Sequence, residues 1–120
     1  FGLSLPGQNG FWEFGLSLDG DGKPDTFVWH APQDHNPATA AQAVRLTAAR
    51  DENRKTTTYQ ATIPFAAIGL ADPSQPIAYN LLINDNDGEM RESYLQLAPG
   101  QGGSKNPTLW PLLQLAAAAH

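Results

Sequence analysis

The residues of this chain best suited to bind an ion are carboxylates in two short segments. The first segment, DGDGKPD, places Asp19, Asp21 and Asp25 at its positions 1, 3 and 7. Glycines let such a loop turn tightly, so the three carboxylates can converge on Ca²⁺, which prefers oxygen ligands. The alternative is a solvated Asp-Gly hairpin turn, because that turn uses the same residue types. The loop is not an EF-hand, since His30 stands where the bidentate glutamate belongs.

A second acidic segment, Asn84 to Glu89, follows the apolar run 81–83. Asp85 ends that predicted buried strand, and a buried carboxylate needs a metal, an arginine or several N–H donors. Arg91 and Lys105 offer ion pairing as the alternative to a metal. We predict structural Ca²⁺ with candidate ligands in each segment separately, Asp19, Asp21 and Asp25 in the first and Asp85 and Asp87 in the second.

Aromatic side chains supply the second kind of candidate site. Sugar binding needs an exposed aromatic face with hydrogen-bonding groups around it. Trp12 alternates with Phe14 and so favours the core, and the apolar neighbours of Trp110 also favour the core. Trp29 precedes a polar loop and can face either way. The predicted sugar-binding residues are Trp29, His30, Gln33 and Asp34, with Trp110 as a second aromatic candidate.

Short β-type segments must position these residues. Ten prolines and eleven glycines interrupt the chain too often for long helices. Strict alternation over 11–18 indicates a half-buried strand. We expect a proline-rich loop over residues 31–39 and one helical turn, beginning at a proline, over residues 64–70. The predicted hairpins join 11–18 to 26–30, 42–50 to 56–63, and 81–83 to 93–97, which favours an all-β antiparallel β-sandwich.

Length and charge exclude several classes. With 120 residues, the chain predicts one domain, 1–115, followed by a vector or tag remnant at 116–120. The net charge of −5 opposes binding to nucleic acid. No apolar run is long enough for a membrane-spanning helix. The absence of cysteine removes disulfides, thiol nucleophiles and Cys-ligated zinc.

A series of short motifs stands in order along the second half of the chain: Thr58 to Pro64, Ile68-Gly69-Leu70, Tyr79-Asn80, Asn84-Asp85, Arg91 and Lys105-Asn106-Pro107. In these motifs the chain resembles the C-terminal part of the family 9 carbohydrate-binding modules, and the likeness extends over residues 10–115. This resemblance implies a calcium-stabilised β-sandwich that binds sugars, does no chemistry and works outside the cell or in the periplasm.

The chain departs from that family at the sugar site. Gly15, Ser17, Leu82 and Ser104 stand where the resemblance implies an arginine, an asparagine, a glutamine and a tryptophan. An N-terminal part of the family sandwich also has no counterpart. Half a sandwich exposes sheet edges and an apolar face. Either a second copy in a homodimer or a missing N-terminal segment completes it, or the architecture is shortened.

The predicted function is therefore that of a non-catalytic module that recognises a polysaccharide or its chain end and is appended to an extracellular glycan-active protein. The alternative is a calcium-stabilised structural or interaction domain that binds no sugar. Enzyme hypotheses have less support. Paired carboxylates can hydrolyse glycosides, and His30 with Asp34 or His35 can form a base and its orienting group, but both patterns also occur in ordinary turns.

Overall fold

The computed structural model describes residues 1–85 and 93–116. The chain divides into two compact units, one formed by residues 1–11 together with the chain from Asp72 onward, and the other by Trp12–Ala71. Antiparallel β-strands dominate both units and the helices are short, so the β-rich fold class is confirmed.

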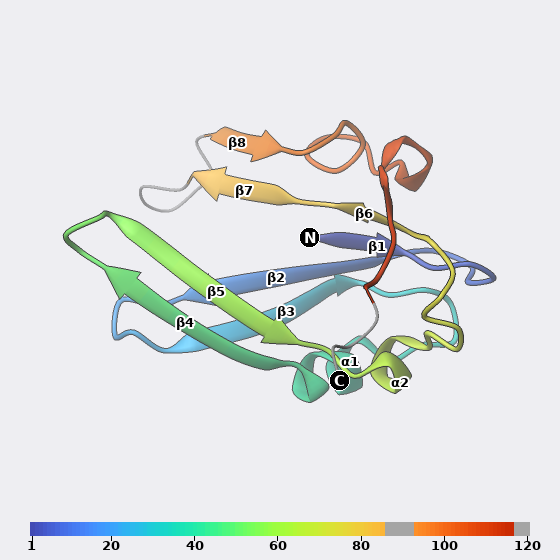
Figure 1. The fold of residues 1–120 in the computed structure, drawn as a ribbon, viewed down its shortest axis with the longest axis horizontal. Helices are drawn as coiled ribbons and strands as arrows, with labels where there is room; N and C mark the ends of the chain where they lie inside the picture. Colours follow the sequence, from blue (N-terminus) through green and yellow to red (C-terminus); the bar gives the residue numbers. More distant parts are fainter. Residues whose placement is uncertain (86–92, 117–120) are drawn as a thin grey trace. The chain divides into compact units, whose positions relative to one another are not determined.

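In the Trp12–Ala71 unit, the first hairpin pairs β2 (Trp12–Leu18) with β3 (Pro24–His30), as the alternation predicts (Figure 1). Trp12 and Phe14 are fully buried and their rings stack at 5.7 Å between centroids. Trp12 and Phe14 are two residues apart on β2, so their side chains point to the same face of the strand. Together they form the aromatic core of this unit.

A helix follows where the sequence predicts a loop. Helix α1 (Pro37–Ala43) begins after Asn36, whose side-chain oxygen accepts hydrogen bonds from the backbone N–H groups of Ala38 and Thr39. Proline at the first helical position and four alanines in seven residues then favour the helix. The prediction of a loop over 31–39 and a strand from 42 is therefore wrong at this point.

The second hairpin of this unit pairs β4 (Arg45–Asp51) with β5 (Thr56–Thr62), and these are the two segments that the sequence predicts to pair (Figure 1). Helix α2 (Phe65–Ile68) is the predicted helical turn after Pro64. It ends at Gly69, whose φ of 71° lies in the left-handed region that glycine adopts without steric strain.

The other unit contains a small antiparallel sheet in the order β1 (Gly2–Ser4), β6 (Ile77–Asn80) and β9 (Leu112–Leu113). Its hairpin pairs β7 (Leu82–Asp85) with β8 (Ser93–Gln96), and the 3-10 helix η1 (Pro107–Leu109) precedes β9. The predicted apolar strand at 81–83 corresponds to β7, which begins at Leu82, and Leu81 divides β7 from β6, which ends at Asn80.

Asn80 explains this division. Its buried side chain donates from Nδ2 to the carbonyl of Ala98 at 2.8 Å and accepts from the N–H of Ala98 at 2.9 Å. The amide side chain therefore pairs with a neighbouring backbone as another strand residue would. This pair of hydrogen bonds ties the end of β6 to the beginning of the glycine-rich loop after β8.

Candidate functional site

A β-bulge in the first hairpin places two candidate sugar-binding residues on one face. Glu13 pairs with His30 and Phe14 pairs with Val28, so the register between the strands skips Trp29. In a regular strand, the consecutive residues Trp29 and His30 would point to opposite faces. The extra residue re-aims the side chains, so that Trp29 lies over Gly15 while His30 faces Glu13.

Trp29 lies against the backbone of the neighbouring strand. A Cβ atom added to Gly15 would come within 2.6 Å of Cη2 of the indole, so the ring covers this glycine closely. Even so, 58% of Trp29 is exposed, and Phe27, the direct cross-strand partner of Gly15, is 47% exposed. Two aromatic side chains are therefore open to solvent on the Gly15 face of the hairpin.

A carboxylate and an imidazole stand next to these rings. Oε1 of Glu13 lies 3.8 Å from Nε2 of His30, with 6% of the Glu13 side chain and 49% of the His30 side chain exposed. A buried carboxylate requires polar neighbours, and His30 is one of them. The exposed part of the imidazole can donate or accept a hydrogen bond at the edge of the aromatic surface.

Polar side chains also lie at the other end of β3. Asp25 is exposed and pairs directly with Ser17 of β2, which places both side chains on the Gly15 face. We name the side chains of Asp25, Phe27, Trp29 and His30 the β3 row. The row has two aromatic members in its middle and a hydrogen-bonding group at each end.

Gln33 and Asp34, the remaining loop candidates, lie just beyond β3 and are exposed. Asp34 adopts a φ of 68°, a left-handed conformation that aspartate tolerates better than most residues. His35 instead packs edge-on against the buried Trp12 ring, with centroids 5.4 Å apart. The polar loop therefore divides into two exposed residues and one that contributes to the core.

Trp110 does not offer its ring to a ligand. Only 5% of this residue is exposed, and its indole N–H donates to the carbonyl of Gly100 at 3.0 Å. The ring lies against Gly2 and makes an edge contact with Phe11 at 5.6 Å between centroids. The selection of Trp110 as a sugar-binding residue is corrected by this burial, which its apolar sequence neighbours already indicated.

The carboxylates at 19–25 form a hairpin turn. Oδ1 of Asp19 accepts the backbone N–H groups of Asp21 at 2.9 Å and Lys23 at 2.8 Å, and Oδ1 of Asp25 accepts that of Thr26. Across the described part of the chain, no group of three or more acidic or histidine side chains is placed to hold a metal. These hydrogen bonds show that the segment forms a turn, and Ca²⁺ binding by Asp19, Asp21 and Asp25 stays a prediction.

The second acidic segment gives no such information. β7 includes the backbone of Asp85, but the Asp85 side chain and the whole of Asp87 and Glu89 lie outside the described residues. Ca²⁺ binding by Asp85 and Asp87 therefore stays a prediction.

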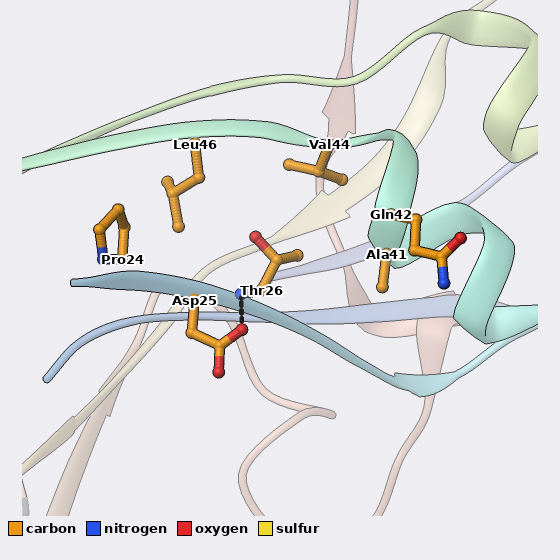
Figure 2. Close-up of a pocket in the computed structure, with 7 residues that line it drawn as sticks. All are labelled: Pro24, Asp25, Thr26, Ala41, Gln42, Val44 and Leu46. Carbon is orange, nitrogen blue, oxygen red and sulfur yellow. Dashed lines mark hydrogen bonds between the residues drawn. The ribbon is translucent and has the colours of Figure 1, made fainter.

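A pocket of about 330 Å³ lies on the other side of β3 (Figure 2). Figure 2 shows Thr26 pointing toward Val44 and Leu46, while the Asp25 carboxylate points away from them. This agrees with the pairing of Thr26 with Leu16 and of Asp25 with Ser17. The lining residues are Pro24, Asp25, Thr26, Ala41, Gln42, Val44 and Leu46.

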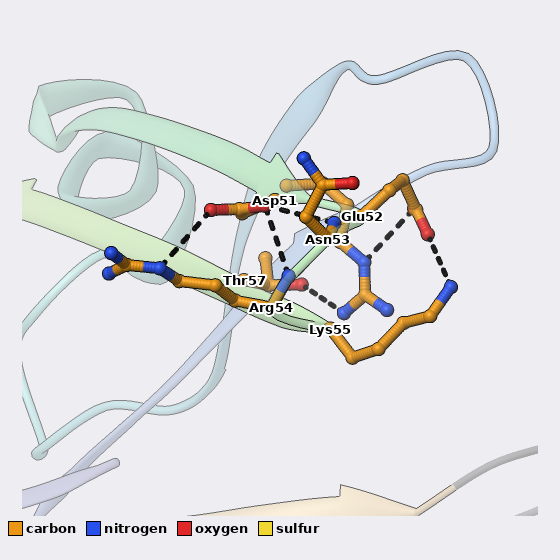
Figure 3. Close-up of polar contacts among 7 residues, drawn as sticks. Asp51, Glu52, Asn53, Arg54, Lys55 and Thr57 are labelled. Carbon is orange, nitrogen blue, oxygen red and sulfur yellow. Dashed lines mark hydrogen bonds and ion pairs between the residues drawn. The ribbon is translucent and has the colours of Figure 1, made fainter.

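The turn between β4 and β5 collects charge of both signs (Figure 3). Glu52 contacts Lys55 at 3.2 Å and Arg50 at 3.1 Å, and hydrogen bonds from these two side chains lower the pKa of Glu52 below its usual value. Asp51 accepts the backbone N–H groups of Asn53 and Arg54. These carboxylates therefore close an exposed turn through backbone hydrogen bonds and ion pairs.

The β7–β8 hairpin carries an exposed apolar face. Ile83 pairs with Leu95, and the N–H of Leu97 donates to the carbonyl of Leu81 at 2.8 Å, so these four side chains share one side of the hairpin. All four are exposed. Tyr94, in contrast, lies over Gly102 of the glycine-rich loop.

Among the helices that the structure describes, none is both long and apolar enough to cross a bilayer.

Sequence reasoning missed Phe27, Glu13 and Gly15. Alternation over 25–29 could have placed Phe27 with Trp29, but a bulge leaves no reliable sequence signal.

No protein-family model, curated protein or solved structure matches this chain. Membership of the family 9 carbohydrate-binding modules therefore stays a prediction.

Proposed function

We propose that this chain is a non-catalytic carbohydrate-binding module and that the β3 row is its binding surface. The observation that carries the proposal is the exposed indole of Trp29, which lies across Gly15 with its other side open to solvent. A flat aromatic surface covers the apolar C–H side of a sugar ring, and neighbouring polar groups bind the hydroxyls. His30 and Asp25 supply such groups at the two ends.

In this proposal the domain brings a larger glycan-active protein to its polysaccharide outside the cell or in the periplasm. Catalysis is not assigned to the surface. The buried Glu13 carboxylate lies beside His30, and hydrolysis of a glycosidic bond needs a pair of carboxyl groups on either side of that bond. The β3 row instead presents aromatic area, which is what retention requires.

Trp29→Ala tests the proposal directly. Truncation of a central aromatic residue typically costs about 2 kcal/mol of binding free energy, so affinity should fall about 30-fold while the domain stays folded. Retention of the protein on immobilised cellulose, xylan and mannan, followed by calorimetry on the best ligand, measures the loss. Unchanged retention by a folded Trp29→Ala variant would remove the β3 row as the site.

Gly15→Ala sharpens the same experiment without deleting an aromatic ring. The added Cβ would meet Cη2 of Trp29 at 2.6 Å, so the exposed indole must swing away from the strand. Affinity should fall by about tenfold, which corresponds to about 1.4 kcal/mol. Gly20→Ala is the matched control, because a Cβ at Gly20 meets nothing within 4 Å.

A structural Ca²⁺ is proposed separately for the acidic segment after β7. The β3 row needs no metal, so EDTA should leave sugar affinity unchanged in protein that remains folded. If Asp85 and Asp87 hold Ca²⁺, EDTA should lower Tm and added Ca²⁺ should restore it. An unchanged Tm would withdraw the Ca²⁺ proposal and leave the sugar proposal standing.

The exposed apolar face of β7 and β8 favours a second candidate, an interaction domain that binds no sugar. Contiguous exposed apolar side chains are typical of protein-binding surfaces. Sedimentation velocity of the wild type and of Leu95→Lys distinguishes the two functions. A dimer that Leu95→Lys dissociates, together with no retention on any glycan, would support the interaction domain.

A further inference from the structure

The β3 row is long compared with a single sugar ring. Asp25, Phe27 and Trp29 follow one another at every second residue of β3, so their Cα atoms extend over at most about 13 Å, with the bulge at Trp29. Trp29 covers Gly15, and Phe27 is the direct partner of that glycine. Both aromatic side chains therefore lie on the same face of the hairpin, one after the other along the strand.

Hydrogen-bonding groups lie at both ends of this surface. Asp25 and Ser17 face each other at one end, and His30 and Glu13 face each other at the other end. A ligand of one ring can cover one aromatic side chain and reach one polar pair. A ligand that uses both aromatic side chains and both polar pairs must extend along β3.

The row is also open. Phe27 and Trp29 are both about half exposed, and the pocket beside β3 belongs to the Thr26 side of the strand. A site that captures a chain end needs a wall at which the chain stops. An aromatic row on the exposed face of a hairpin leaves room for a chain to continue beyond its ends.

We infer that the ligand of the β3 row is an internal stretch of an unbranched polysaccharide lying along the strand, and not a monosaccharide or a chain end. This inference rests on the proposed function. It adds that affinity grows with ligand length until the ligand covers the row, because each aromatic side chain and each polar pair contributes contact area only when a sugar unit reaches it.

Calorimetry with defined oligosaccharides tests the inference on the intact chain. The probes are gluco-, xylo- and manno-oligosaccharides with β-1,4 links and one to six sugar units. In the series that binds best, affinity should rise stepwise with length and then level off. Phe27→Ala should weaken binding of the longest oligomers about tenfold and leave the shortest ones unchanged, which reduces the dependence on length.

Tyr59→Ala is the control, because Tyr59 is an exposed aromatic residue on β5 and does not belong to the row. It should keep the full dependence on length. If the wild type bound oligosaccharides of all lengths with equal affinity, and Trp29→Ala abolished that binding, the extended-chain inference would be overturned. The proposed function would remain. No binding at any length in the three series, with no retention on the polymers, would overturn both.

Discussion

Trp29 and Trp110 are built in the same way and end in opposite environments. Each indole lies over a glycine of a neighbouring strand, Gly15 for Trp29 and Gly2 for Trp110, and an added Cβ would approach the ring to 2.6 Å and 2.4 Å respectively. Trp29 is 58% exposed, whereas Trp110 is 5% exposed. A glycine under an indole therefore indicates close packing on a strand and does not indicate whether the ring binds a ligand.

The two indoles differ in exposure because different groups contact the ring side that faces away from the glycine. Trp110 has Phe11 against its edge and the carbonyl of Gly100 to accept its N–H, as a buried tryptophan requires. Trp29 has solvent on its second side. Trp110 thus contributes nearly all of its area to folding, whereas Trp29 leaves more than half of its area exposed to solvent.

Alanine substitution should separate the two tryptophans most clearly. Trp110→Ala should lower the free energy of unfolding by about 3–5 kcal/mol, because it leaves a cavity in the core. Trp29→Ala should change it by less than about 1 kcal/mol, since the ring is already half hydrated. Urea unfolding followed by circular dichroism measures both. Equal losses would mean that Trp29 is a core residue in solution.

The glycines should give a smaller contrast of the same kind. Gly2→Ala forces the buried Trp110 ring against its neighbours and should destabilise the fold by about 1–3 kcal/mol. Gly15→Ala should cost little stability, because the exposed Trp29 ring can move. Thermal unfolding of both variants beside Gly103→Ala, where a Cβ meets nothing within 4 Å, provides the comparison. A larger Tm loss for Gly15→Ala would contradict it.

Phenylalanine substitution should show the smallest effect and isolate the indole N–H. Trp110→Phe removes the donor to Gly100, and an unmade buried hydrogen bond costs about 1–3 kcal/mol, so Tm should fall by a few degrees. Trp29→Phe keeps an aromatic face and should retain both Tm and most of the sugar affinity. A stable Trp110→Phe with unchanged Tm would show that packing alone holds Trp110.

The hairpins were predictable because their signals are local. Alternation of Trp12, Phe14 and Leu16, a loop of aspartates and glycines, and a second run of β-type residues determine β2 and β3 together. Helix α1 was missed because the hairpin expected between 42–50 and 56–63 was preferred over the helix propensity of the alanines, and the Asn36 cap was not used as a start signal.

The candidate site was only partly predictable. The sequence placed Trp29 and His30 at the end of a predicted strand, 26–30, and grouped them with Gln33 and Asp34 of the loop that follows. The structure confirms the strand and adds a bulge that turns both side chains toward Glu13 and Gly15. The Asp19 loop illustrates the converse, since its composition allowed an ion site and its hydrogen bonds show a turn.

By itself, the amino-acid sequence determined that this chain forms short antiparallel strands, carries a net negative charge and holds most of its aromatic residues at strand positions. These properties depend on neighbours within a few residues, so they can be read along the chain. The tertiary structure alone decided which indole is covered and which carboxylates meet a positive or polar group. Coverage and pairing depend on residues far apart in the sequence, and strand register, including a single extra residue, sets which of them meet.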